Sequence, residues 1–232
     1  MAEIDGENRI TMLELYNDIT AQAWSMFDSE VESKDEFEAS VTTSLQKSLT
    51  DLWNSYPFPF REKTHILLLR ARKADYLAPT GNIKTRISNG SKVYAVNCNG
   101  NWLRYNPDCQ YADAASGEPT DFYLKQNRIY FYPVPDKNYN VFIDYLSIYP
   151  ACNEDGEEKQ FLEEETDYLN IPEEYHALFK CALMPLTMWN YLIASESDEN
   201  SSAYEIQYKR AYKQLIKYTK GIETEKTIGW RG

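Results

Sequence analysis

The sequence has few of the residues on which catalytic and metal sites depend. It holds only two histidines, His65 and His176, and neither has a Cys, a Ser or a carboxylate at a recognisable catalytic or metal-binding spacing. No two cysteines form a C-x-x-C pair, and neither a G-x-S-x-G elbow nor a Walker phosphate loop is present. These absences argue against an enzyme and predict no catalytic residues, no metal and no cofactor.

Long apolar runs and an excess of positive charge are also missing. No stretch approaches the roughly eighteen apolar residues that cross a bilayer, and the opening MAEIDGENRI is too polar and acidic for a signal peptide. We therefore expect a chain made in the cytoplasm, with no membrane partner and with four free thiols. The formal net charge of −12 argues against gripping nucleic acid by its phosphates, although an acidic wall would let DNA slide past it.

Tyrosine, in contrast, is abundant. Of the 232 residues 19 are Tyr, and aromatic residues make up 14% of the chain. A Tyr ring has a flat apolar face and one polar tip, so it suits surfaces that become buried against partner proteins. A β-rich core with many half-buried rings would need the same composition, and both interpretations stay open here.

Two helices are predicted before residue 58, each opened by a capping box. In such a box the two side chains satisfy free backbone N–H groups at the start of the helix. Apolar residues then recur every three or four positions, and YPFPF (56–60) ends the second helix because proline lacks an N–H. The boxes are Thr11 with Glu14 and Ser33 with Glu36.

From about residue 60 to residue 150 the pattern changes to short alternating runs, which predicts antiparallel strands. Asn99-Gly100 is a strong hairpin signal because a type I′ turn needs positive φ, and Gln126-Asn127 is a second candidate. Several strands at this spacing are typical of a small sandwich or barrel. The candidate strands are THILLLR (64–70), KVYAVN (92–97), NWLRY (101–105), TDFYLK (120–125), RIYFYPV (128–134) and YNVFIDYLS (139–147).

An acidic segment follows over residues 151–169 and lacks the periodicity of a helix or strand. It does not have the D-x-D-x-D-G spacing of a calcium loop, so we expect a solvated, mobile loop rather than a cation site. Its carboxylates are Glu154, Asp155, Glu157, Glu158, Glu163, Glu164, Glu165 and Asp167.

The order helix, helix, strands, helix, helix predicts an α+β fold. The N- and C-terminal helices, in residues 1–58 and 170–220, form a helical bundle, because packing them together gives each apolar stripe a partner. The antiparallel β-sandwich or barrel lobe over 59–150 is inserted between them. Residues 151–169 are the acidic loop, and residues 221–232 are a loose C-terminal tail.

The last predicted helix, over about 203–220, places its cations on the side opposite its apolar face. Five cations on one face of an acidic protein predict docking against an acidic partner surface, such as the next copy of the same chain. A solvated helix face is the alternative. Trp230 in the tail either folds back onto the core or anchors in a neighbour. The predicted partner-binding residues are Lys209, Arg210, Lys213, Lys217, Lys220 and Trp230.

Three segments carry further motifs in a fixed order. FPFREKTHILLLRARKADYLAP (58–79) has a Phe-Arg pair, a strand and a Tyr-x-x-Pro exit. GEPTDFYLKQNRIYFYPVPDKNYNVFIDYLSIYP (117–150) has a Gly-x-Pro and a Pro-x-Pro between strands, and IPEEYHALFKCALMPLTMWNYL (171–192) is a Pro-started helix followed by a second long helix. In this order they resemble the podovirus-type head–tail adaptors of tailed bacteriophages, a family that includes tail tubular proteins. The resemblance covers roughly residues 10–220.

The resemblance implies a structural virion protein that forms a ring, a homo-dodecamer, beneath the portal protein and joins the phage head to the tail. The ring would extend the DNA channel, let DNA pass without specific binding, and present a platform to the next tail protein. The basic face of the last helix would make ring or portal contacts, while Gly117–Pro119 and Pro133–Pro135 would shape the fold. The protein would be a virion component assembled in the host cytoplasm. The acidic segment has no counterpart in the family's pattern.

Two other functions remain open at this point. The β lobe could serve as a carbohydrate- or peptide-binding module of a virion or cell-surface assembly, which would leave several aromatic rings clustered on one open face. A hydrolase built on scattered carboxylates would need two of them facing each other across a cleft. The rings in question are Trp102, Tyr105, Tyr111, Phe122, Tyr130 and Tyr132.

Overall fold

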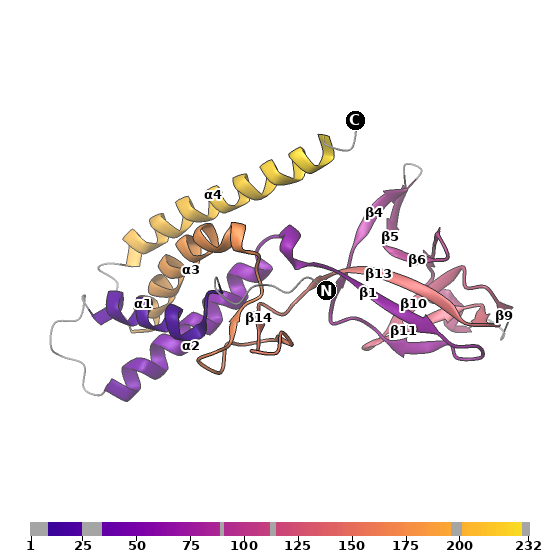
Figure 1. Cartoon of the computed structure of the whole chain (residues 1–232), viewed down its shortest axis with the longest axis horizontal. Coiled ribbons are helices and arrows are strands. Elements are labelled where there is room, and N and C mark those ends of the chain that lie inside the picture. Colours follow the sequence, from indigo (N-terminus) through magenta and orange to yellow (C-terminus); the bar gives the residue numbers. More distant parts are fainter. Residues whose placement is uncertain (1–8, 25–33, 89–90, 112–114, 196–200, 229–232) are drawn as a thin grey trace. The chain divides into compact units, whose positions relative to one another are not determined.

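The computed structural model describes residues 9–24, 34–88, 91–111, 115–195 and 201–228. The chain divides into two compact units, which are described one at a time below. A helical unit comprises the residues up to Phe60 and from Tyr149 onward, and a β unit comprises Arg61–Ile148. The α+β class is therefore confirmed, with helices before and after a β-rich middle in sequence order, which the colours of Figure 1 follow.

In the described ranges, the helical unit contains four long helices. They are α1 (Met12–Trp24), α2 (Lys34–Asn54), α3 (Glu173–Ala194) and α4 (Ser201–Ile228). Helix α3 is the central one, since it packs against each of the other three. Apolar residues at helical spacing on all four helices form one hydrophobic core. They include Leu15, Ile19, Val41, Leu45, Leu49, Phe179, Leu183, Leu186 and Leu215.

The start of α1 has the predicted cap. The Glu14 backbone N–H donates to Thr11 Oγ1 at 3.2 Å, which satisfies one of the free donors at the helix start. Helix α3 begins directly after Pro172, with Glu173 and Glu174 in its first turn, where carboxylates complement the helix dipole. Ser33 of the second predicted box lies outside the described residues.

Helix α4 continues beyond its predicted end. The sequence predicts an end at about Lys220, but the backbone stays helical to Ile228, so residues 221–228 of the predicted tail are helical. The stretch ETEK (223–226) has no apolar periodicity, yet Glu and Lys are strong helix formers, and this propensity extends the helix.

Helix α3 is also long and apolar enough, by length and composition alone, to cross a membrane, as no other helix in the described ranges is. The prediction that no segment has this character is wrong for α3. Half of its most apolar window is buried inside the helical unit, and Phe179, Leu183 and Leu186 belong to the core. Its hydrophobicity is that of a helix covered by three others.

Two sheets enclose the core of the β unit. The first has the order β1 (Glu62–Leu69), β13 (Tyr139–Ser147), β6 (Val96–Cys98), β7 (Asn101–Trp102), and β3 (Gly81–Ile83) also pairs with β13. The second has the order β2 (Asp75–Leu77), β11 (Arg128–Tyr132), β10 (Asp121–Lys125), β8 (Arg104–Tyr105). Side chains from both sheets form one apolar cluster, as in a sandwich: Leu69, Tyr76, Val96, Phe122, Ile129, Phe131, Val141 and Ile143.

Both predicted hairpins are present. Asn99 and Gly100 have φ of +49° and +87° and connect β6 to β7, with Cys98 paired to Asn101. Gln126 has φ of +56° in the turn between Lys125 of β10 and Arg128 of β11. Positive φ closes a tight turn whose twist matches that of the flanking strands.

Two predicted strands are each divided between different sheets. KVYAVN separates into β5 (Ser91–Tyr94), which pairs with β4 (Thr85–Ser88), and β6 of the first sheet. NWLRY separates into β7 and β8, one in each sheet. The breaks fall at Ala95 and Leu103, whose buried side chains lie at the change of sheet. Alternation along the chain does not reveal which neighbour a strand pairs with.

The proline and glycine motifs of the β unit meet in space. Strand β9 (Ser116–Gly117) pairs in parallel with β12 (Val134–Pro135), so that Gly117 lies opposite Pro135. This pairing agrees with a role in shaping the fold. Two short 3₁₀ helices, η1 (Pro59–Arg61) and η2 (Pro107–Tyr111), complete the elements outside the acidic segment.

The Phe-Arg pair has one residue in each unit. Phe60 lies among the rings of Trp53, Phe58, Tyr175 and Phe179 in the helical core. Arg61 is buried in the β unit and donates from Nε to the Ser147 carbonyl at 3.1 Å, and burial lowers the pKa of its guanidinium. All four cysteines are free, as predicted.

Candidate interaction surfaces

Helix α4 separates a buried face from a basic face. Tyr204, Leu215 and Thr219 are buried, and Trp189 of α3 stacks on Tyr208 with 6.2 Å between ring centroids. The Tyr212 hydroxyl donates to the Ser55 carbonyl at 3.2 Å, which ties α4 to the end of α2. These contacts hold the helix so that its opposite side faces solvent.

All five predicted basic residues of α4 are exposed on this opposite side: Lys209, Arg210, Lys213, Lys217 and Lys220. Lys209 forms an ion pair with Glu205 one turn earlier. Ile206 precedes Lys209, Arg210 and Lys213 by three, four and seven positions, so it lies among these cations, and 51% of its side chain is exposed. We call these six residues the basic face of α4.

Ile206 was not among the predicted contact residues, although its spacing from the cations could have identified it. A cationic surface with an exposed aliphatic side chain inside it is suited to bind an acidic protein surface, because the apolar contact adds to the charge attraction. Trp230 lies outside the described residues, and its role stays a prediction.

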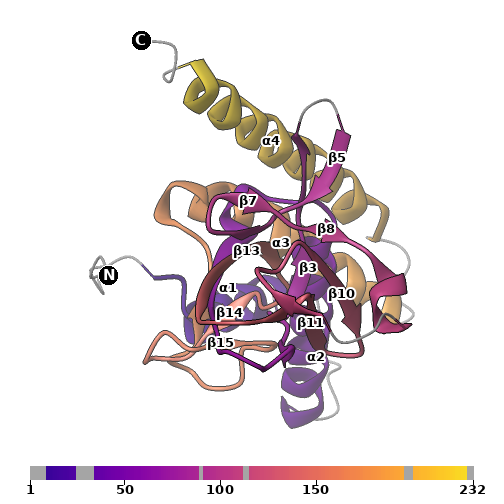
Figure 2. The same ribbon diagram turned by 90° about the vertical axis from the view of Figure 1, so that its right-hand side faces the viewer.

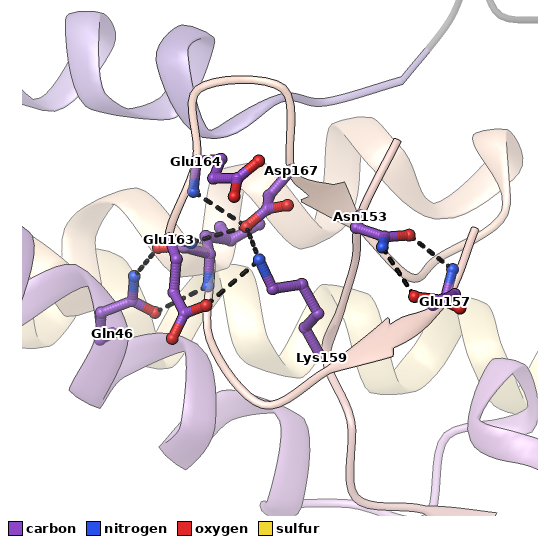
Figure 3. A network of polar contacts seen from close by, with 8 residues as sticks. Gln46, Asn153, Glu157, Lys159, Glu163, Glu164 and Asp167 are labelled. Atoms are coloured by element: carbon purple, nitrogen blue, oxygen red, sulfur yellow. Dashed lines mark hydrogen bonds and ion pairs between the residues drawn. The ribbon is translucent and has the colours of Figure 1, made fainter. Parts of the chain in front are cut away.

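The acidic segment is an ordered structure and not the solvated loop that its composition predicts. Strands β14 (Ala151–Cys152), β15 (Glu158–Lys159) and β16 (Tyr168–Leu169) form a small sheet within it. Asp167 is fully buried and receives hydrogen bonds on Oδ2 from Lys159 Nζ at 2.8 Å and from two backbone N–H groups (Figure 3). Those groups belong to Glu163 and Glu164, at 2.7 and 2.9 Å.

The same segment holds the first helices of the chain. Gln46 of α2 exchanges two hydrogen bonds with the backbone of Leu162, whose side chain is buried. The first N–H groups of α1 donate to the segment, Met12 to the Asp167 carbonyl at 2.7 Å and Leu13 to the Glu165 carbonyl at 3.3 Å. The segment therefore caps α1, since these donors have no partner within the helix.

Burial would raise the pKa of Asp167, but the hydrogen bonds from Lys159 and from the Glu164 and Glu163 backbone outweigh it and hold the pKa below its usual value. A carboxyl with a lowered pKa stabilises the folded state at pH above its unfolded pKa of about 4, and this contribution is lost as the pH falls through its folded pKa.

Asp167→Asn should therefore lower the free energy of unfolding by about 2 kcal/mol at neutral pH, because it removes the charge that pairs with Lys159. The difference between variant and wild type should shrink as the pH falls below about 4. Urea unfolding of both proteins between neutral and acid pH measures it. Glu164→Gln, at an exposed carboxylate of the same turn, should change little. A difference that stays constant with pH would contradict the assignment.

Six carboxylates of the segment remain exposed on this scaffold: Glu154, Asp155, Glu157, Glu163, Glu164 and Glu165. Asn153 accepts a hydrogen bond from the Glu157 backbone N–H on its side-chain oxygen at 2.7 Å and orders the turn between them (Figure 3). Across the described ranges no group of three or more His, Cys, Asp or Glu side chains is arranged to hold a metal ion. His176 contacts the Ile171 carbonyl through Nε2 at 3.1 Å.

Among the described side chains, the candidate aromatic rings of the β unit do not gather on one open face. Phe122 is fully buried, Tyr105 is 38% exposed and contacts Phe122, and Trp102, Tyr130 and Tyr132 are half-buried. Tyr130 stacks on Tyr123 at 4.7 Å between centroids, which covers one of its faces. The side chain of Tyr111 lies outside what the structure describes. This arrangement does not favour a sugar- or peptide-binding surface.

The model of one family, described as SU10 adaptor protein, matches residues 6–226, which is nearly the whole chain. The match spans both units, including the acidic segment and the basic face of α4. No curated protein matches the chain.

Proposed function

Because this chain belongs to the SU10 adaptor protein family and is thus a phage adaptor, a structural component of the virion, we propose that it forms the ring that joins head to tail. The ring lies beneath the portal protein, extends the DNA channel, and binds the next tail protein on its other side. It is assembled in the host cytoplasm from about twelve copies, in a closed cyclic arrangement without catalysis.

The basic face of α4 is the observation that carries this proposal. Its cations are exposed together on a helix that is anchored to α3 by buried side chains, so the surface is presented in a fixed geometry. Most of the protein is acidic, with a net charge of −12. A basic surface on an acidic protein is complementary to another copy of that protein, and this favours ring contacts or portal contacts through α4.

The acidic character also suits a channel. DNA passing through a ring must not be held by its phosphates, because each neutralised phosphate would retain it. Exposed carboxylates such as Glu163, Glu164 and Glu165 repel a phosphate backbone at short range. We propose that DNA moves past the ring without specific binding and that no membrane takes part.

Mass photometry of the purified protein, alone and mixed with the portal protein of the same virus, tests the proposal. The expected result is a portal complex whose mass increases by about twelve copies of this chain, the number that the resemblance to head–tail adaptors implies, in a closed cyclic ring. A portal protein from an unrelated phage is the control and should gain no mass. No association with the cognate portal at any salt concentration would contradict the portal contact.

A further inference from the structure

Within the described ranges, strand β1 lies at the edge of the first sheet and pairs along one side. It is eight residues long and, in the part of the chain that the structure describes, pairs with β13 alone. An edge of this length presents a row of backbone N–H and C=O groups to any strand that reaches it. Proteins protect such edges with charges, but Ile66, Leu67, Leu68 and Leu69 make the second half of β1 entirely apolar.

The outer face of the same sheet is apolar beside this edge. Ile66 is 64% exposed and Leu68 53%, and Phe142 of β13, which lies opposite Ile66, is 41% exposed. The cross-strand register continues from Phe142 to Asn97 and from Asn97 to Trp102, so one row of side chains crosses four strands on this face. An exposed apolar patch of this kind is typical of a contact with another protein.

The same unit also has a separate two-stranded hairpin. Strands β4 and β5 pair with each other over four residues each and, within the described ranges, with no further strand. They project from the two sheets (Figures 1 and 2). A two-stranded hairpin alone is marginally stable in water, so a third strand would stabilise it.

From these two features we propose that β1 of one copy pairs with the β4–β5 hairpin of the next copy, so that the first sheet continues from subunit to subunit. The four residues of each hairpin strand match the four apolar residues of β1. Because two different surfaces of one chain meet, the contact is head-to-tail, which a ring requires. The inference thus rests on the proposed adaptor function and names the contact between copies.

The structure offers a variant that removes the hairpin while keeping its base. The Ala95 backbone N–H donates to the Lys84 carbonyl at 2.7 Å, and Thr85 pairs with Tyr94. Replacing residues 86–93 by Asn-Gly should therefore leave a two-residue turn on an intact base. The edge is blocked separately by Ile66→Lys, since a charge at an edge opposes strand addition. Leu77→Lys, 62% exposed on the edge strand β2 of the other sheet, is the matched control.

Self-association is measured by mass photometry and by light scattering after gel filtration, with circular dichroism as the test of folding. Each blocked variant alone should associate at least about tenfold more weakly than wild type, whereas Leu77→Lys should associate normally. A mixture of the short-hairpin variant and Ile66→Lys should form a 1:1 dimer and nothing larger, because one intact hairpin can still meet one intact β1.

Several outcomes would overturn the inference. One is that either blocked variant assembles normally, and another is that Leu77→Lys loses self-association to the same extent as the blocked variants. The others are that the mixture forms no dimer and that the wild-type chain never self-associates, alone or on the portal. Portal binding is scored separately in each case. Variants that assemble normally and still bind the portal would refute the β1 contact and leave the adaptor function standing.

Discussion

Reversing the charge of the basic face of α4 is expected to release the chain from its assembly while leaving it folded. The variant carries Lys209→Glu, Arg210→Glu, Lys213→Glu and Lys217→Glu, all at exposed positions. A contact between opposite charges then becomes one between like charges, which costs several kcal/mol. Association with the portal, or between copies, should fall by about a hundredfold or more.

The fold should survive because no buried contact is removed. Lys209→Glu replaces the ion pair with Glu205 by a like-charge pair at i,i+4, which costs only about 0.5 kcal/mol in an exposed helix. Gln207→Glu with Gln214→Glu is the control for position, since it adds acid to exposed sites of α4 outside the basic face. Thermal unfolding confirms folding, and mass photometry measures assembly.

Salt gives an independent readout of the same contact. If charge attraction stabilises the contact made by the basic face of α4, wild-type association should weaken as ionic strength rises, because salt screens charges near the surface. Association of the charge-reversed protein, which is already weak, should change little as ionic strength rises. Normal assembly of the charge-reversed protein would contradict the assignment of a contact to the basic face of α4. Loss of assembly in both this protein and the glutamine control would indicate an effect of net charge and not of this face.

Gly81→Ala should unfold the edge of the β unit where β3 joins β13. A Cβ built at Gly81 would lie 2.2 Å from the Leu146 carbonyl oxygen and 2.7 Å from a ring carbon of Tyr145. This oxygen belongs to the backbone of β13, the strand that pairs with β3. It cannot move aside without breaking the register of Gly81 with Ser147 and of Asn82 with Leu146. We expect a loss of about 2–3 kcal/mol, as for overpacking in a tight interior.

The control for this substitution lies in the helical unit. Gly221 of α4 has nothing within 4 Å of an added Cβ, so Gly221→Ala should leave stability unchanged or raise it by up to about 1 kcal/mol. Thermal unfolding followed by circular dichroism compares the two variants with wild type. The first should lower the melting temperature by about 5–10 °C. Equal melting temperatures for both variants would show that the strand relaxes around the methyl group.

Features that depend on residues close in sequence were predicted correctly. The cap at Thr11, the turn at Asn99-Gly100, the helix that starts after Pro172 and the apolar face of α4 all follow from contacts within a few residues. The exposed cations of α4 belong to this class, because helical spacing alone puts them opposite Tyr204 and Leu215. Ile206 could have been added by the same rule.

Features that depend on contacts between distant segments were not predicted correctly. Ala95 divides one predicted strand between the β4–β5 pair and the first sheet, and Leu103 divides another between the first and second sheets. No local pattern encodes which partner each half takes. The acidic segment was expected in solvent, because it lacks the periodicity of a helix or strand and the spacing of a calcium loop. It is ordered because Asp167 meets Lys159 inside the unit and Gln46 of α2 binds Leu162 across 116 positions of sequence.

By itself, then, the sequence determined the class of fold, the four helices, the two tight turns and the basic face of α4, because propensity, capping and periodicity act over a few residues. The tertiary structure alone decided the strand partners, the capping of α1 by the backbone carbonyls of Asp167 and Glu165, and, within the described ranges, the unpaired edge of β1 beside its apolar face. Each of these depends on the free energy of a contact between segments far apart in the chain, and such a contact exists only after the chain has folded.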